Sequence, residues 1–349
     1  MSADLTVTYW GVTGSMSDPL RPEQVTNKVL ACLEYLIEQG RLAALRPGPE
    51  LREALRRELE AVPFAFRSTW GGNTTCVEVA TPDGLFILDC GSGMRELGVE
   101  LYRRWNDPAF PGPREAQVLV THPHMDHTFA TPFFGPYYDP RNRFTIWGTQ
   151  SVLDSLRAVL SDSSVLAQTY FPLTFAQMKA LQGFVEVRPG KVATVGETRV
   201  LTYALRHPGG CVAYRLESGG KSFVFATDHE HAEAPDPGLA EFARGADLFY
   251  TEGQYTQEEY EGQRGLPGEP PLPRRGWGHS PVEACIKTAV AAGVKILHVG
   301  HRDPLRSDDD LARMEVYCRE LLAQELQQTG RPPGSTKVAI PYEGLRMQL

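Results

Sequence analysis

The densest group of reactive side chains lies in the stretch THPHMDHT, residues 121–128. It brings together three imidazoles and one carboxylate, from His122, His124, Asp126 and His127. Burying so many polar groups at one strand end costs free energy unless each has a partner. Imidazole and carboxylate are ligands that suit zinc and similar ions. Two residues apart on an extended chain, His122 and His124 point the same way and can share one ion, while Asp126 and His127 follow a turn and can reach a second.

Two ions need more ligands than these four, and the later part of the chain offers them. All nine histidines lie between His122 and His301. His207 precedes Pro-Gly-Gly, where glycine lets the backbone pass close to a site. Asp228 ends an Ala-Thr-Asp sequence, where a carboxylate can bridge two ions. The candidates that follow strand-like runs are His207, Asp228, His279, His298 and His301.

Short apolar runs predict the strands that must position these side chains. The clearest are residues 5–10, 76–79, 85–88, 117–120, 144–148, 200–205, 212–216, 222–226 and 295–299. Helices are predicted at 151–160, at 281–292 after an N-cap at Ser280, and from Ser307 onward. Strands and helices alternate without the regular rhythm of a barrel, which favours layered sheets with helices outside.

One long segment, Pro22 to Val62, contains no histidine and is predicted to be helical. Its first part places Val25, Val29, Cys32, Leu33 and Leu36 on one face, and its second part places Leu51, Leu55 and Leu59 on another. Pro47-Gly-Pro separates the two parts. We interpret the segment as an inserted helical hairpin that adds cover to the core, closes over the site as a lid, or forms the contact of a homodimer.

Composition narrows the class of protein. The chain has 349 residues, 42% of them hydrophobic, and a formal net charge of -8. This composition is typical of a globular protein, and the negative charge argues against an extended nucleic-acid surface. A small anionic substrate stays open because a bound metal supplies local positive charge. Without a long apolar run or a signal-like start, we expect no membrane span and a cytoplasmic location, to which six cysteines without a CxxC pair also point.

These motifs, in this order, resemble the metallo-β-lactamase superfamily, in particular its ribonuclease Z and phosphodiesterase-like branch. The HxHxDH signature matches residues 122–127, and it is fairly specific. The other matching sequences are His207-Pro-Gly-Gly, Ala-Thr-Asp228, Gly278-His279-Ser280, Val-Gly-His301-Arg-Asp303-Pro, Trp10-Gly-Val-Thr-Gly-Ser15, Trp70-Gly-Gly-Asn73-Thr and Leu88-Asp89-Cys-Gly-Ser-Gly93. The resemblance covers nearly the whole chain and implies an α/β fold, a four-layer αββα sandwich formed by residues 1–349 as a single domain, with 20–66 as a helical insertion.

The resemblance also implies a role for each matching residue. His122, His124 and His207 would hold one divalent ion, Asp126, His127 and His301 the second, and Asp228 would bridge them. The ions would be zinc, with manganese or iron as alternatives. Asp89 would orient a ligand, and Asp126 and His279 would act in catalysis, His279 by assisting the leaving group.

Four residues near these motifs have weaker assignments. The offset to Asp303-Pro304 favours His301 over His298, which is then a core residue of its strand. His229 and His231 are expected in a loop or at the surface, with an altered site around His229 as the alternative. The role of Glu252 is open.

The sequence therefore predicts a dinuclear hydrolase of small phosphodiesters such as cyclic nucleotides. Hydrolysis of a carboxylic ester, lactone or thioester at the same site is the alternative within enzymes. A non-catalytic, metal-containing sensor is the alternative outside them.

Overall fold

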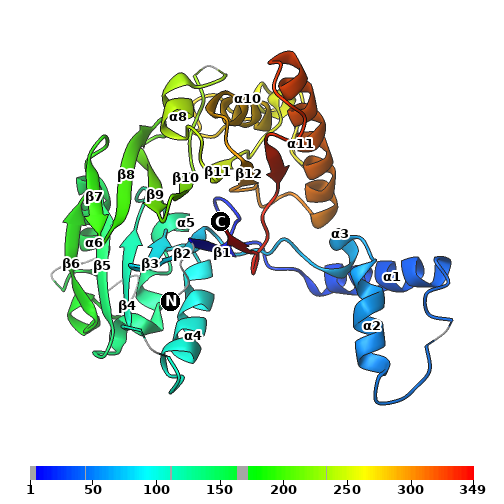
Figure 1. Cartoon of the computed structure of the whole chain (residues 1–349), viewed down its shortest axis with the longest axis horizontal. Helices are drawn as coiled ribbons and strands as arrows, with labels where there is room; N and C mark the ends of the chain where they lie inside the picture. Colours follow the sequence, from blue (N-terminus) through cyan, green and yellow to red (C-terminus); the bar gives the residue numbers. More distant parts are fainter. Residues whose placement is uncertain (1–4, 44, 111, 163–171, 233) are drawn as a thin grey trace.

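Two mixed sheets form the centre of the molecule in the computed structural model, which describes residues 5–43, 45–110, 112–162, 172–232 and 234–349 (Figure 1). The first sheet has the order β14-β1-β2-β3-β4-β5-β6 and the second β13-β12-β11-β10-β9-β8-β7. The first comprises β1 (Thr6–Gly11), β2 (Cys76–Thr81), β3 (Gly84–Leu88), β4 (Glu115–Leu119), β5 (Arg143–Gly148), β6 (Leu181–Glu186) and β14 (Arg346–Gln348). The second comprises β7 (Val192–Val195), β8 (Thr198–Leu205), β9 (Cys211–Ser218), β10 (Lys221–Ala226), β11 (Leu248–Glu252), β12 (Ile296–Gly300) and β13 (Lys337–Ala339).

Each sheet changes from antiparallel to parallel pairing along its order. Strands β1 to β3 pair antiparallel and β3 to β6 parallel. In the second sheet β7 to β10 pair antiparallel and β10 to β13 parallel. Parallel neighbours end at the same edge of a sheet, so the loops that follow β3, β4, β10, β11 and β12 can converge.

Helices cover the outer face of each sheet, which completes the predicted αββα sandwich (Figure 1). One apolar cluster lies under α4 (Gly93–Trp105) and α6 (Gln150–Leu160), and another under α8 (Pro237–Phe242), α10 (Val282–Ala292) and α11 (Asp308–Gln328). A third, between the sheets, includes Val7, Tyr9, Phe223 and Tyr250. The shorter helices are α5 (Met125–Thr128), α9 (Gln257–Tyr260) and the 3₁₀ turns η1 (Thr131–Phe133), η2 (Gly135–Tyr138) and η3 (Phe175–Gln177).

The predicted core position of His298 is confirmed. It lies in β12, 2% exposed, and shares a hydrogen bond of 2.7 Å with the hydroxyl of Tyr9 on β1. This bond joins the two sheets across the core. The prediction of Ser280 as an N-cap was wrong, because α10 is capped at Pro281 and the Ser280 hydroxyl donates to the carbonyl of His229 instead.

The insertion is helical, as predicted, and consists of α1 (Pro22–Glu38), α2 (Leu51–Glu60) and α3 (Phe64–Arg67). Helices α1 and α2 project away from the sheets (Figure 1). Apolar side chains of α1 face solvent rather than the core: Val25, Val29, Leu30, Leu33 and Ile37. The expectation that this face covers the core was therefore wrong for Val25, Val29 and Leu33, although Leu36 is buried. A lid and a homodimer contact stay predictions.

The opposite side of α1 faces the body of the molecule. There the Lys28 ammonium lies 2.6 Å from Asp308 at the start of α11, and it donates to the carbonyl of Ser68 at 2.7 Å. A polar anchor thus fixes this helix, together with the buried side chain of Leu36. Among the described residues no helix combines the length and the apolar character that a membrane crossing needs.

Candidate metal centre

The predicted ligands lie at the ends of strands from both sheets. His122, His124 and His127 follow β4, and His207 follows β8. Asp228 follows β10 and His301 follows β12. His301 and Asp89, which follows β3, have φ values of 50° and 63°. Residues other than glycine rarely take this left-handed conformation, and it is concentrated at functional sites.

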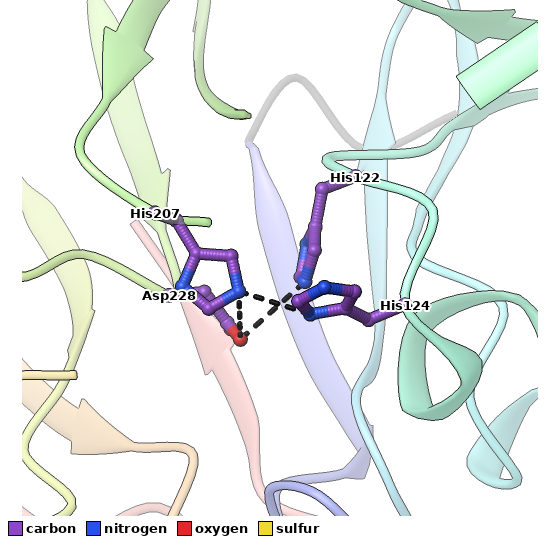
Figure 2. A group of neighbouring side chains, drawn as sticks. All are labelled: His122, His124, His207 and Asp228. Atoms are coloured by element: carbon purple, nitrogen blue, oxygen red, sulfur yellow. Dashed lines mark hydrogen bonds and ion pairs between the residues drawn. The ribbon is translucent and has the colours of Figure 1, made fainter. Parts of the chain in front are cut away.

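The first group contains His122, His124, His207 and Asp228, whose donor atoms all lie within 4.8 Å of one another (Figure 2). Nε2 of His207 is 3.0 Å from Nδ1 of His124. Oδ2 of Asp228 is 3.5 Å from Nε2 of His122 and 3.7 Å from Nε2 of His207. The four side chains therefore converge on one point.

The second group contains Asp126, His127, His301 and again Asp228. Nε2 of His127 is 3.2 Å from Nε2 of His301 and 3.1 Å from Oδ2 of Asp126. Oδ1 of Asp228 lies 3.1 Å from Nε2 of His301 and 3.3 Å from that of His127. One oxygen of Asp228 thus faces each group, which is the placement that a bridging carboxylate requires.

The donor atoms in both groups fit divalent cations. Nε2 of His122 is buried and has no hydrogen-bond partner among the described residues, so the first group contains a polar atom whose hydrogen-bonding capacity is unmet. Nδ1 of His207 donates to the Gly278 carbonyl at 2.8 Å, and Nδ1 of His127 donates to Asp89 at 2.7 Å. These bonds leave the Nε2 lone pairs free for an ion, as in most histidine metal sites. Imidazoles with carboxylates suit zinc, and also manganese or iron.

The electrostatic environment of the site favours, for most of these side chains, the protonation states that bind cations, which are neutral imidazole and ionised carboxylate. Burial lowers the pKa values of His122, His124 and His207, which keeps their imidazoles neutral. Burial alone would raise the pKa values of Asp126 and Asp228, but the neighbouring histidines outweigh it and hold both carboxyls below their usual range. Burial would lower the pKa of His127, but the carboxylates of Asp126, Asp228 and Asp89 outweigh it and raise the pKa well above its usual range, so a cation would displace a proton from this ring.

Asp89 supports the second group from behind. It is fully buried and accepts hydrogen bonds from the backbone N–H and hydroxyl of Thr121, at 2.8 and 3.0 Å, besides the one from His127. These bonds fix the ring of His127 and the start of the histidine loop. The geometry agrees with the ligand-orienting role that the family resemblance implies for Asp89.

His279 lies beside both groups and is paired with Glu252, whose role the sequence left open. Nδ1 of His279 is 2.8 Å from Oε2 of Glu252, and the His279 ring is 5.3 Å from the ring of His207 and 5.2 Å from that of His301. Burial would lower the pKa of His279, but the Glu252 carboxylate outweighs it and raises the pKa to about 9. His279 therefore carries a proton at neutral pH.

His229 and His231 lie in a loop, which is one of the two positions expected for them, but not at the surface. They are buried, and Nε2 of His229 lies 3.1 Å from Oδ2 of Asp236. Nδ1 of His231 is 2.5 Å from the Ser280 hydroxyl. Their side chains tie the loop after β10 to its surroundings, and neither belongs to either ligand group.

Sequence reasoning missed Glu230, which lies between these two histidines. Its carboxylate accepts hydrogen bonds from the Tyr260 hydroxyl at 2.5 Å and from the backbone N–H groups of Gly276 and Gly278, at 2.7 and 2.9 Å. Glu230 thereby holds the loop that carries His279. A third charged residue directly after Asp228-His229 was the available signal.

Comparisons with known proteins agree with this geometry. A family model described as the beta-lactamase superfamily domain matches residues 86–302. Ribonuclease BN from Shigella boydii serotype 18 is 26% identical over 182 residues, which cover 50% of this chain and 53% of that protein. The chain thus spans about half the length of the curated relatives it matches.

Solved structures of low identity share the fold. Yeast PDE1 aligns over 100% of both chains with a TM-score of 0.60 and 13% identity. The metallo-beta-lactamase fold protein YhfI from Bacillus subtilis aligns over 100% of both chains with a TM-score of 0.58 and 14% identity. With its two sheets, its histidine and aspartate groups and the matching family model, the chain belongs to the metallo-β-lactamase superfamily.

Proposed function

We propose that this protein is a dinuclear metal-dependent hydrolase of small phosphodiesters, such as cyclic nucleotides. The observation that carries the proposal is the placement of Asp228 between two ligand groups, with the hydrogen-bonded pair of His279 and Glu252 beside both. The curated relatives are ribonucleases, which break phosphodiester bonds. The net charge of -8 favours a small substrate over a long nucleic acid.

Divalent cations in the two groups would supply a water of lowered pKa and positive charge for the phosphoryl oxygens. The protein itself supplies the remaining functions. Asp126 stays a carboxylate held by the Ser15 N–H at 2.8 Å, so it can accept a hydrogen bond from the attacking water. Glu252 occupies Nδ1 of His279, which leaves Nε2 as the atom that gives a proton to the departing oxygen. A well-placed acid of this kind contributes roughly 10²–10⁴-fold.

The test is hydrolysis of bis(p-nitrophenyl) phosphate and of cyclic mono- and dinucleotides by protein of known metal content. We expect Asp126→Ala and His207→Ala to abolish turnover. Asp154→Ala, which removes an exposed carboxylate on α6, should leave turnover unchanged. Metal-loaded protein that hydrolyses lactones or thioesters but no phosphodiester would overturn the proposal.

His279 gives a second, sharper test. We expect His279→Asn to slow esters of simple alcohols by roughly 10²–10⁴-fold, because an alkoxide needs a proton to leave. The same substitution should slow p-nitrophenyl esters far less, because p-nitrophenolate leaves without one. Equal losses on both substrates would show that His279 is not the acid.

A further inference from the structure

A hollow of about 520 Å³ lies beside the candidate metal centre. Its lining includes the ligand His207, together with Arg206, Glu230, Tyr260 and Arg275. His207 also belongs to the first ligand group, so the hollow and the candidate metal centre are neighbours that share this side chain. We call it the arginine pocket.

Two arginines give this pocket its charge. Both Arg206 and Arg275 are exposed, and the Arg275 guanidinium lies 5.3 Å from the centre of the Tyr260 ring. Arg206 has no side-chain hydrogen bond or ion pair with any residue that the structure describes, and the nearest carboxylate oxygen to Arg275 is 3.8 Å away, on Glu261. Both guanidinium groups therefore keep donors for a ligand. In a protein of net charge -8, two such arginines beside the active centre favour an anion there.

Among the described residues that line the pocket, the one carboxylate is already engaged. Glu230 accepts hydrogen bonds from Tyr260, Gly276 and Gly278, so its oxygens face donors of the protein. Burial raises the pKa of Tyr260 to about 12, an effect that Glu230 strengthens and that both Arg275 and Arg206 oppose. The two arginines therefore act on the same small region of the pocket wall.

The pocket adjoins the loop that carries His279, the proposed acid for the leaving group. Gly276 lines it, and the same short loop continues through Gly278 to His279. The rings of His279 and His207 are 5.3 Å apart. Under the proposed function the leaving alcohol receives its proton from His279, so a group attached to that alcohol lies near His207 and the pocket that His207 lines.

On the basis of the proposed function, we propose that the arginine pocket binds a second phosphate group, carried by the leaving alcohol of the substrate. Arginine presents planar paired donors that match phosphate oxygens. In the reaction, water forms a new bond to the reacting phosphorus and the bond to the alcohol oxygen breaks. The His279 proton passes to that oxygen. The products are a phosphomonoester and an alcohol that keeps its own phosphate.

Equilibrium binding tests the pocket without turnover. Isothermal titration calorimetry of metal-free protein compares the affinity for 1,3-propanediol phosphate with that for unphosphorylated 1,3-propanediol. The difference measures how much the second phosphate alone contributes to binding. We expect binding of the phosphate only. Arg206→Met and Arg275→Met should each weaken it about tenfold, as expected for loss of one charge-assisted hydrogen bond. Arg56→Met, at an exposed position on α2, is the matched control and should bind like the wild type.

Turnover gives an independent readout. Methyl 3-phosphopropyl phosphate and methyl 3-hydroxypropyl phosphate differ only in the second phosphate, and release of methyl phosphate identifies the bond that breaks. We expect the wild type to prefer the first through a lower KM, and the double variant Arg206→Met/Arg275→Met to lose this preference. The control variant Arg56→Met should keep both the preference and the hydrolysis of bis(p-nitrophenyl) phosphate.

The two proposals fail in different ways. No hydrolysis of bis(p-nitrophenyl) phosphate by the metal-loaded wild type would overturn the proposed function, whatever the titration shows. Equal binding of 1,3-propanediol phosphate by the wild type and the double variant, or no binding by either, would overturn the arginine pocket even if that hydrolysis is fast.

Discussion

The hydrogen bond between Tyr9 and His298 predicts a specific loss of stability in acid. Both side chains are buried between the sheets, 0% and 2% exposed, and burial lowers the pKa of His298 to about 4. An unfolded histidine titrates at about 6.5. As the pH falls, the unfolded chain therefore takes up this proton first, so the folded state loses stability between these two values and none of this loss occurs above them.

The two pKa values set the size of the effect. Linkage of one proton to unfolding lowers the free energy of unfolding by about 2 kcal/mol between about pH 7.5 and about pH 5, and by about 3 kcal/mol once the pH is below both values. His298→Leu removes the titrating group and keeps an apolar side chain in the core. The variant should therefore lose about 2 kcal/mol less than the wild type over the same interval.

Urea unfolding of metal-free protein at several pH values measures this difference, because contributions from the other histidines are common to both proteins. Tyr9→Phe is the control. It leaves His298 in place but removes its partner, so it should lower the free energy of unfolding by about 1–3 kcal/mol at neutral pH while a pH dependence like that of the wild type persists. Parallel curves for the wild type and His298→Leu would refute the reasoning.

Three further predictions concern the supports of the metal centre and of the insertion. Asp89→Asn should weaken metal affinity by about 10–100-fold, measured by competition with a chelator, because the ligand His127 loses its anionic hydrogen-bond acceptor. Gly278→Ala should also weaken metal binding, since an added Cβ would lie 2.3 Å from Nδ1 of His207, whereas Gly276→Ala has nothing within 4 Å of its Cβ and should do so less. Lys28→Met should speed proteolysis within residues 20–66 and leave the unfolding of the sheets unchanged. Equal cleavage rates for the variant and the wild type would contradict the view that the pair of Lys28 and Asp308 anchors α1.

Part of the candidate ligand set could be predicted because its signal is local. The HxHxDH spacing places His122, His124 and Asp126 in the segment that follows β4, so these residues needed no tertiary information, whereas His207, Asp228 and His301 were assigned through the family resemblance. The fold followed from the same motifs. The position of His298 within its strand was also predictable, because an offset of three residues separates it from His301 at the strand end.

The remaining features depend on contacts between distant segments. Periodicity shows that α1 has an apolar face but not which face meets the body, and the pairing of Lys28 with Asp308, 280 residues later in the chain, decides that. The roles of Glu252 and Glu230 likewise arise from pairing with the loop that carries His279. A single carboxylate in a sequence does not reveal such a partner.

The metal centre also explains why the two sheets must be held in a fixed relation. The histidine loop belongs to the first sheet, yet Asp228 and His301 come from the second. Two hydrogen bonds join the sheets beside the ligands: the N–H of Val212 donates to the Thr121 carbonyl at 3.1 Å, and the Tyr214 hydroxyl donates to the Val120 carbonyl at 2.9 Å. Since a shift of the sheets would separate the two oxygens of Asp228 from one ligand group, packing of the core and affinity for metal depend on the same contacts.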